Sequence, residues 1–410
     1  MQQLKTESQR REDEIIKKTD AVIAKTYARF PVVLEKGRGC TVWDIHGKAY
    51  TDFVAGIAVC NLGHAHPAVA AAVAEQADRL VHVSNLYYTI PQVEIASRLI
   101  ECSFADRVFF CNSGAEANEA AIKLARKYFK GKETPPRYRI VVMEKSFHGR
   151  TMATLSATGQ DKIRKGFDPV LEGFDFVPFN DIEALKAKVD AGTCAVLTEP
   201  IQGEGGVNCP DPGYLQGVRR ICDAAGALLI FDEIQTGMGR TGTLFAYQNY
   251  DVEPDIMTLA KALANGLPMG AMLARESVAQ AFGPGSHATT FGATPLVTAA
   301  AGEVFRLLTD GKILDNCREV GAYFEEKLSW LQNRHSSIAG IRGRGLMLGV
   351  KLNTEGGPIV KECLDRGFLI NCIQENVLRF VPPLIITKEE VASLIDCLDG
   401  VLRKLETDKG

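Results

Sequence analysis

Short apolar runs alternate with helical segments through the middle of the chain. The runs lie within DRVFFC, YRIVVME, FDFVPF, CAVLTEP and ALLIFDE, and apolar residues recur at helical spacing between them. Apolar strands that alternate with helices are typical of a mostly parallel sheet with both faces covered. We therefore expect a large α/β domain over residues 66–295, which begins with the helical segment HPAVAAAVAEQADRLVH.

The two ends of the chain have different patterns. Residues 1–30 predict a helix of mixed charge, and the short runs and glycines of VVLEKGRGCTVWDIHGKAYTDF predict a small β-meander. From residue 296 a helical stretch extends to Trp330, and the strand-like GRGLMLGVKL, GFLINCI and VLRFVPPL precede a final charged helix. We expect segments 1–65 and 296–410 to form a smaller α+β domain.

Composition excludes several classes of partner. A formal charge of −3 over 410 residues argues against nucleic acid or an anionic membrane as the main partner. No apolar run approaches the roughly 20 residues that span a bilayer. The start MQQLKTESQRREDEIIKK is too polar for a signal peptide and too acidic for a transit peptide.

Cysteine and histidine usage points to a cytoplasmic protein without a metal. The eleven cysteines are scattered and contain no C-x2-C pair, which favours reduced thiols over a disulfide framework or a zinc site. His64 and His66 in GHAHP are candidate metal ligands, but no cysteine or carboxylate cluster lies beside them. Ordinary hydrogen-bonded histidines are therefore favoured there.

Polar residues follow the ends of predicted strands at three places, where open α/β sheets bind ligands. The first is the turn Asn112-Ser113-Gly114-Ala115 between DRVFFC and a helix. Free N–H groups at a helix start suit a phosphate. The alternative is an ordinary helix start, capped by Ser113 and closed by Glu116. The turn is not a Walker loop, because no Gly-Lys-Ser/Thr follows it.

The other two places carry a carboxylate and a lysine. Asp232 follows the apolar ALLIF directly, and it either caps a loop or pairs with a buried cation such as a protonated ring nitrogen. Lys261 in TLAKALANG either extends its ammonium to water or is an amine kept partly neutral for attack on a carbonyl. A phosphate site, an acid and a lysine are together what pyridoxal phosphate requires.

The order of several motifs closely resembles the class III, ornithine-type aminotransferases. These motifs are NSGAEANEAAIKLAR, FHGRT, TEPIQGEGG, LLIFDEIQTGMGRTG, PDIMTLAKALANGLPMGAML and TTFGATPL, and the resemblance covers GIAVCNLGHAHP to RFVPPLIIT. SNLYYTIPQVEIASRLIE, GTLFAYQNY and RGRGLMLGVKL are similar to the N-acetylornithine branch of that class. The resemblance implies a fold-type I, pyridoxal 5′-phosphate-dependent enzyme that is a homodimer with shared active sites.

The same resemblance assigns cofactor contacts. Lys261 would bind the aldehyde of the cofactor and then move a proton between Cα and C4′, and Asp232 would pair with the pyridinium nitrogen. The other implied contacts are Ser113, Gly114 and Ala115 at the phosphate, Phe147 stacked on the ring, Gln235 at the ring's 3-oxygen, and Thr290, which would reach the phosphate of the neighbouring subunit.

The implied substrate contacts follow a ping-pong logic. Arg150 would bind a substrate carboxylate as a bidentate fork, and Glu199, Glu204 and Thr289 would lie beside the substrate, with Arg379 facing Glu204. Such a transaminase accepts an amine end without a carboxylate in one half-reaction and the α-carboxylate of glutamate in the other. Glu204 would mask Arg379 in the first half-reaction and release it in the second.

The implied reaction moves the δ-amino group of N2-acetylornithine to 2-oxoglutarate in arginine biosynthesis, with N-succinyl-diaminopimelate as a further donor. Alternatives are ornithine or 4-aminobutyrate aminotransferase, a glutamate-semialdehyde-type aminomutase, and a cofactor-binding protein without turnover. The chain departs from the family pattern at Ala293-Thr294 and at Cys60-Asn61. Both departures are expected near the substrate side and the dimer interface.

Overall fold

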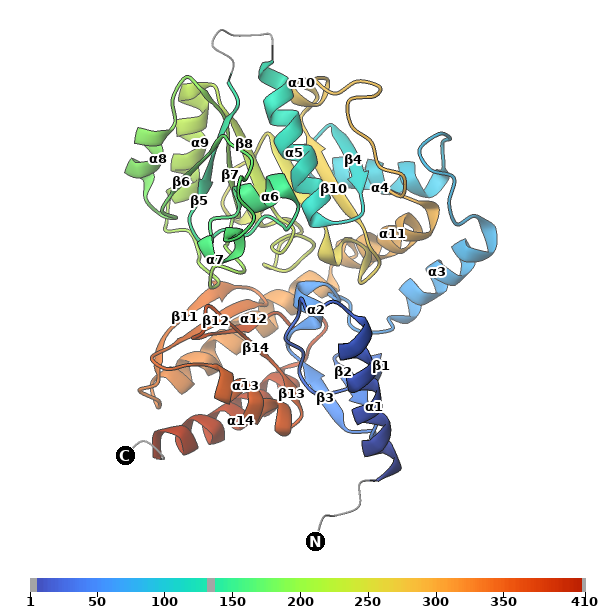
Figure 1. Cartoon of the computed structure of the whole chain (residues 1–410), viewed down its shortest axis with the longest axis vertical. Helices are drawn as coiled ribbons and strands as arrows, with labels where there is room; N and C mark the ends of the chain where they lie inside the picture. Colours follow the sequence, from blue (N-terminus) through green and yellow to red (C-terminus); the bar gives the residue numbers. More distant parts are fainter. Residues whose placement is uncertain (1–5, 131–136, 408–410) are drawn as a thin grey trace.

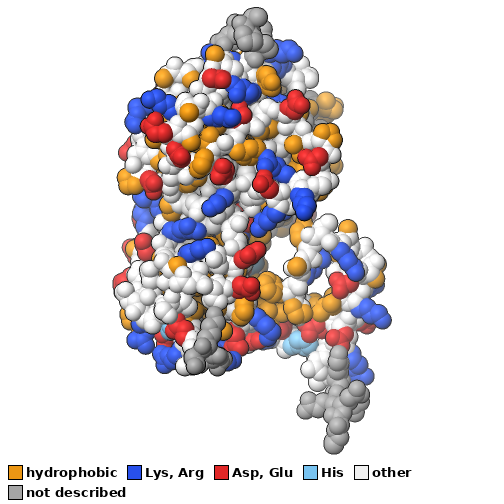
Figure 2. Space-filling model, turned by 60° about the vertical axis from the view of Figure 1, so that its left-hand side comes forward, with side chains coloured by type: hydrophobic (Ala, Val, Ile, Leu, Met, Phe, Trp, Pro, Cys, Tyr) orange, Lys and Arg blue, Asp and Glu red, His pale blue; other side chains and the backbone are white. Residues whose placement is uncertain are grey.

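The structure, a computed structural model, describes residues 6–130 and 137–407. The chain forms two lobes, an upper one around a seven-stranded sheet and a lower one with two four-stranded sheets (Figure 1). The first and last helices, α1 (Glu7–Val22) and α14 (Lys388–Thr407), both lie in the lower lobe. The space-filling view shows a recess between the upper lobe and a projecting part of the lower lobe (Figure 2).

The seven-stranded sheet has the order β4-β10-β9-β8-β7-β5-β6. Its strands from β9 to β6 pair in parallel, whereas β10 is antiparallel to both β4 and β9. The bounds are β4 (Arg107–Cys111), β5 (Arg139–Met143), β6 (Phe174–Val177), β7 (Thr193–Thr198), β8 (Leu228–Asp232), β9 (Ile256–Leu259) and β10 (Gly270–Ala274). The mostly parallel α/β sheet predicted from the apolar runs is confirmed. Strands β9 and β10 were not among the strands predicted from these runs.

Helices cover both faces of this sheet (Figure 1). Helix α5 (Gly114–Phe129) buries an alanine-rich stripe that includes Ala117, Ala121 and Leu124 against the strands. The other helices and turns of the upper lobe are α3 (Pro67–Arg79), α4 (Ile90–Glu101), α6 (Met152–Ala157), α7 (Asp161–Arg164), α8 (Ile182–Lys188), α9 (Tyr214–Ala225), η1 (Ala246–Asn249), η2 (Lys261–Ala264), α10 (Glu276–Ala279) and α11 (Pro295–Thr309).

The lower lobe joins the two ends of the chain in one sheet. The predicted meander is confirmed as the antiparallel strands β1 (Leu34–Arg38), β2 (Thr41–Asp44) and β3 (Ala49–Asp52), which α2 (Ala55–Ala58) follows. Strand β13 (Phe368–Leu369) comes from the other end of the chain and pairs in parallel with β3. The predicted N-terminal helix over residues 1–30 is too long, because the chain turns extended at Ile23.

The C-terminal segment differs from the prediction at one glycine. The helical stretch expected to run unbroken to Trp330 is two helices, α11 and α12 (Lys312–Gln332). Gly311 between them has a φ of 98°, which glycine adopts readily and which turns the chain out of α11. The rest of the segment is an antiparallel sheet with two helices: β11 (Ile338–Arg344), β12 (Met347–Leu352), β14 (Asn371–Ile373), β15 (Val377–Phe380), α13 (Gly357–Asp365) and α14.

A fully buried arginine connects the two lobes next to the sheet edge. Arg240 donates from Nη1 to the carbonyls of Leu346 (2.8 Å) and Pro382 (2.6 Å), and from Nη2 to the Asn61 side chain. Burial lowers the pKa of Arg240 to about 10. Asn61, one of the departures from the family pattern, thus has a structural role. Within the described residues, no helix is long and apolar enough to cross a membrane.

Candidate active site

A cavity of about 390 Å³ lies at the carboxyl edge of the seven-stranded sheet. Its walls are the loops that follow β4, β5, β7, β8 and β9. It brings together many of the residues that the sequence singled out, namely Ser113, Gly114, Ala115, Phe147, Glu199, Glu204, Asp232, Gln235 and Lys261. Segments separated by more than a hundred positions in the sequence therefore meet in one site.

The start of α5 forms one wall of this cavity. The Ser113 side chain accepts a hydrogen bond from the Glu116 N–H at 3.2 Å and caps the helix. The Glu116 carboxylate accepts from the Asn112 N–H at 2.6 Å. Helix geometry leaves the N–H groups of Gly114 and Ala115 without intrahelical acceptors. The turn is therefore both a capped helix start and a site suited to an anion.

A hydrogen-bonded network holds the carboxylate of Asp232. Asp232 Oδ2 accepts from Asn118 Nδ2 at 2.7 Å and from His148 Nδ1 at 2.8 Å. Asp232 Oδ1 accepts from the Ile234 N–H at 3.0 Å, and Thr258 on β9 donates to Asn118 Oδ1 at 2.8 Å. Asp232 is almost completely buried and lines the cavity, and these hydrogen bonds fix the orientation of its carboxylate.

Lys261 follows β9 after a single residue and begins η2. Its φ of 45° is left-handed, a conformation that costs on the order of 1 kcal/mol or more outside glycine. Burial lowers the pKa of Lys261 below that of a free lysine; Glu204 opposes this shift and Arg379 reinforces it. The lowered pKa increases the fraction of neutral amine, which is the form that attacks a carbonyl carbon.

Glu199 supports the loop that carries Phe147. Its carboxylate accepts from the N–H groups of Phe147 (3.2 Å) and Gly203 (3.0 Å). Burial raises the pKa of Glu199 to about 7, with His148 opposing. In this structure Glu199 therefore acts on the loop backbone as well as lining the cavity.

Glu204 and Arg379 form an ion pair in which the arginine is buried and the glutamate is partly exposed. Glu204 Oε1 lies 2.5 Å from Arg379 Nη1, and the Arg379 side chain on β15 is only 1 % exposed. Gln235 joins the pair, accepting from Arg379 at 3.2 Å and donating to Glu204 at 3.4 Å. Burial alone would raise the pKa of Glu204, but Arg379 and then Lys261 outweigh it and hold that pKa below its usual value.

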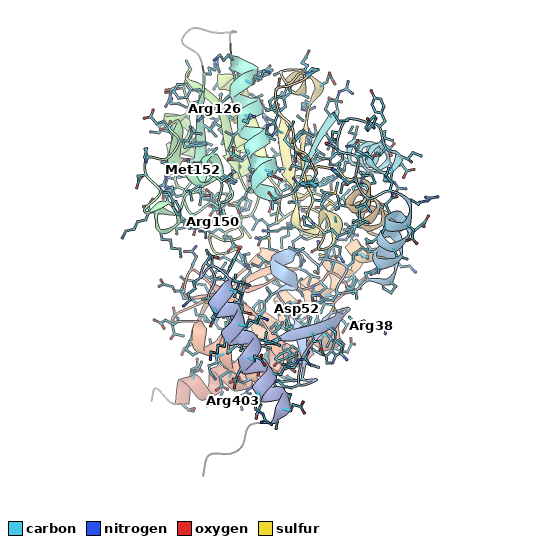
Figure 3. The ribbon with its side chains drawn as sticks, turned by 45° about the vertical axis from the view of Figure 1, so that its right-hand side comes forward. Arg38, Asp52, Arg126, Arg150, Met152 and Arg403 are labelled. Carbon is cyan, nitrogen blue, oxygen red and sulfur yellow. The ribbon has the colours of Figure 1, made fainter. Side chains whose placement is uncertain are left out.

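Arg150 lies outside the central cavity, at the wall of a second, more open one. This outer cavity of about 810 Å³ shares Phe147 and Glu204 with the central cavity. The Arg150 guanidinium carbon lies 5.8 Å from the centre of the Phe147 ring. Figure 3 shows Arg150 at the lower edge of the upper lobe, where it faces the lower lobe. The arginine is therefore exposed beside the entrance.

Thr289 and Thr290 do not line the central cavity of their own chain. Thr289 accepts a hydrogen bond from Asn112 Nδ2 at 3.0 Å, beside the start of α5, and Thr290 is exposed. The nearby departure at Thr294 has a local role, because its hydroxyl donates to the Val81 carbonyl at 2.5 Å and contacts His82 Nδ1 at 3.0 Å.

The residues that hold the Asp232 carboxylate were not predicted from the sequence. His148 lies within FHGRT, but no pattern in the sequence indicates that His148, Asn118 and Thr258 would lie near Asp232. His64, considered as a metal ligand, instead bonds Asp52 Oδ2 at 2.7 Å. Among the described residues, no group of three or more His, Cys, Asp or Glu side chains could hold a metal ion.

The central cavity fits pyridoxal 5′-phosphate in its chemistry. Free N–H groups at the start of α5 suit the phosphate, the buried Asp232 suits a protonated ring nitrogen, and Lys261 suits the aldehyde. A Cβ atom at position 203 would lie 2.6 Å from the Gln235 amide. Glycine at this position therefore lets the loop after β7 pack closely against Gln235.

The fold and the site together define a class of enzyme. The class-III aminotransferase family model matches residues 22–402, and the chain belongs to this family. The protein is therefore an aminotransferase that uses pyridoxal 5′-phosphate.

Individual relatives cover almost the whole chain. It is 52 % identical over 381 residues to the acetylornithine aminotransferase of Caldanaerobacter subterraneus subsp. tengcongensis, covering 93 % of this chain and 97 % of that one. The ornithine aminotransferase of Toxoplasma gondii is 36 % identical with a TM-score of 0.94, covering 99 % and 97 %. The N-acetylornithine aminotransferase of Stenotrophomonas maltophilia is 39 % identical with a TM-score of 0.82, covering 96 % and 100 %.

Proposed function

We propose that the enzyme transfers the δ-amino group of N2-acetyl-L-ornithine to 2-oxoglutarate. The products are N-acetyl-L-glutamate 5-semialdehyde and L-glutamate, a step of arginine biosynthesis. The observation that carries the proposal is the Glu204–Arg379 pair beside Lys261, in a chain about half identical to an acetylornithine aminotransferase.

The residues of the central cavity would hold the cofactor in one orientation. Gly114 and Ala115 would bind its phosphate through N–H groups, with Ser113 capping their helix; Phe147 would stack on its ring, Asp232 would hold the proton of its ring nitrogen, and Gln235 would contact the ring's 3-oxygen. When bound, the cofactor supplies an electron sink for the Cα carbanion. Lys261 would bind its aldehyde and afterwards accept the substrate proton and return it at C4′.

The ion pair explains how one site accepts two unlike substrates. With Glu204 on Arg379, the wall near Lys261 offers no free cation, so an uncharged carbon chain with a terminal amine fits there. When Glu204 turns away, Arg379 binds the α-carboxylate of glutamate or 2-oxoglutarate. Gln235 already contacts both partners and can hold either arrangement.

The outer cavity would receive the acylated end of the donor. Arg150 would bind the α-carboxylate there as a bidentate fork, with Glu199 and Thr289 near the substrate. Lys162 lines the same cavity, and its ammonium has no hydrogen bond or ion pair among the described residues. A second carboxylate on the acyl group, as in N-succinyl-diaminopimelate, would meet this lysine, which supports that compound as a further donor.

We propose a homodimer in which Thr290 of each chain contacts the cofactor phosphate of the other. Thr290 is exposed, and Asn85 Nδ2 donates to the Gly292 carbonyl in the same loop at 3.0 Å. Large apolar side chains are exposed around this loop: Leu86, Tyr87, Tyr88, Ile90, Val93 and Phe291. Large apolar side chains exposed near one loop support a protein interface there.

We also propose a domain division and a compartment. Residues 1–65 and 296–410 would form the small domain and residues 66–295 the large one. The pairing of β3 with β13 supports this division, whereas α11 packs against α3 and α4 of the upper lobe and argues for a boundary after it. All eleven cysteines are free thiols, which supports a reducing compartment such as the cytoplasm.

A donor screen tests the proposed reaction. With 2-oxoglutarate as acceptor, glutamate formation should be fastest from N2-acetylornithine, and N-succinyl-diaminopimelate should also react. Faster reaction with ornithine or 4-aminobutyrate would replace the proposed donor. Turnover of a donor that does not require 2-oxoglutarate would indicate an aminomutase.

A further inference from the structure

The hairpin between β14 and β15 has an unusual backbone at its tip. Gln374 and Glu375 have φ values of 47° and 67°, a left-handed region that glycine and asparagine occupy far more readily than glutamine or glutamate. Strain of this kind is retained where the surrounding structure uses it. A side chain kept at such a position is expected to make a contact that glycine could not make.

The side-chain amide of Gln374 makes two such contacts. Its Nε2 donates to the backbone carbonyl of Glu204 at 2.8 Å and to Gln160 Oε1 at 3.1 Å. Gln160 in turn donates to the carbonyl of Ser146 at 3.2 Å, directly before Phe147. One amide from the lower lobe therefore connects the two upper-lobe loops that carry Glu204 and Phe147.

The same hairpin also carries Arg379, the partner of the Glu204 side chain. Glu204 is thus held twice from one element, at its backbone by Gln374 and at its carboxylate by Arg379. We propose that Gln374 is a positioning residue that holds the Glu204 backbone where its carboxylate reaches Arg379, so that uncovering Arg379 breaks the Gln374 hydrogen bond as well as the ion pair. This inference rests on the proposed function.

The proposal predicts how selectivity between the two half-reactions depends on Gln374. Without the hydrogen bond to its carbonyl, Glu204 is held less firmly over Arg379, and the covered state loses population relative to the uncovered state. The acetylornithine half-reaction uses the covered state and slows. The glutamate half-reaction uses the uncovered state and does not slow.

Three variants separate this role from a simple effect on folding. Gln374→Met keeps the size and the backbone strain but removes the N–H donors. Gln374→Gly removes the donors and relieves the strain. Asp251→Gly is the matched control, because Asp251 is exposed, has a left-handed φ of 51° and lines neither cavity. The holoenzyme of each variant is mixed with N2-acetylornithine or with glutamate, and both reactions convert the cofactor to its amino form. The amino form of each variant is also mixed with 2-oxoglutarate. Rates are read from the cofactor absorbance.

The ratio of kcat/KM for acetylornithine to kcat/KM for glutamate should fall about fivefold in both Gln374 variants, the size expected for one neutral hydrogen bond. It should be unchanged in Asp251→Gly, and neither glycine variant should lower Tm. An unchanged ratio in Gln374→Met, or an equal fall in Asp251→Gly, would overturn the positioning role. A wild-type enzyme that fails to react with acetylornithine would instead overturn the proposed function, so the two failures are distinguishable.

Discussion

At the residue scale, the site depends on charges whose effects oppose one another. Asp232 was predicted because it directly follows an apolar run, and Lys261 because it is an isolated lysine in the almost uncharged TLAKALANG. Both were placed at strand ends, where open α/β sheets bind ligands. The partners of Asp232 and Glu204 could not be predicted in this way. Asn118, His148 and Gln374 reach them from distant segments, and only the packed structure sets these distances.

Two arginine substitutions should affect the half-reactions differently. Arg379→Ala removes the buried cation that would bind the glutamate α-carboxylate, a charged contact worth roughly 2–5 kcal/mol. We expect the glutamate half-reaction to slow by at least a hundredfold and the acetylornithine half-reaction far less. Arg150→Lys should slow both, because lysine cannot form the bidentate contact. Equal damage to both half-reactions by Arg379→Ala in single-turnover measurements would refute the masking role.

Glu233 should make stability depend on pH. Burial raises its pKa to about 7, although it accepts hydrogen bonds from the N–H groups of Ala246 (2.6 Å) and Tyr247 (2.8 Å). A carboxyl group whose pKa is higher in the folded state than in the unfolded state stabilises the fold at low pH, and this contribution is lost as pH rises to about 7.

Glu233→Gln tests this dependence because glutamine does not titrate. Between pH 5 and pH 8, the free energy of unfolding of the wild type should fall relative to that of the variant by roughly 2 kcal/mol. Urea unfolding of both proteins at the two pH values provides the measurement. A constant difference between them would show that Glu233 is ionised throughout this range.

At the element scale, five strands of the seven-stranded sheet were predicted from apolar runs, and β9 and β10 were not. These two strands lie in PDIMTLAKALANGLPMGAML, where alanine, leucine and methionine favour a helix and hide the strands. The division of α11 from α12 depends on a single glycine within a continuous helical pattern. For the start of α5 the sequence left two interpretations open, a capped helix and an anion site. The structure shows the Ser113 cap, and the free N–H groups beside it suit an anion.

The start of α5 can be tested with two changes at Ser113. Ser113→Ala removes the cap and should lower stability by about 1 kcal/mol. Ser113→Asp keeps a capping oxygen but places a negative charge where we propose the phosphate binds, so it should weaken cofactor binding more than Ser113→Ala does, with less loss of stability. Titration of the apoenzyme with pyridoxal 5′-phosphate and its thermal midpoint give the two values. Unchanged affinity in Ser113→Asp would place the phosphate elsewhere.

At the scale of the whole molecule, the candidate site lies where the two lobes meet. The central cavity is built by the upper lobe, whereas Arg379 and Gln374 come from the lower lobe. Residues 204 and 374 could not be paired from sequence, because no pattern of periodicity or spacing connects loops on different sheets. The exposed position of Thr290, beside an apolar surface, is consistent with a site completed by a second chain.

Mixed dimers test whether the site is shared. Lys261→Ala and Thr290→Ala homodimers should both be impaired, since each has the same lesion at both sites. After subunit exchange, a mixed dimer collects both lesions in one site and leaves the other intact. We therefore expect activity to rise above that of either parent, toward a quarter of the wild-type value in an equal mixture. No recovery after verified exchange would mean that Thr290 does not act across the interface.

The central claim is that Lys261 is the amine that carries the cofactor. The most direct measurement is to reduce the holoenzyme with borohydride, digest it and locate the cofactor by peptide mass spectrometry. The added mass is expected on Lys261 alone, and it should be absent after prior incubation with N2-acetylornithine, which converts the cofactor to its amino form. Cofactor attached to another lysine, in an enzyme that is fully active before reduction, would contradict the account.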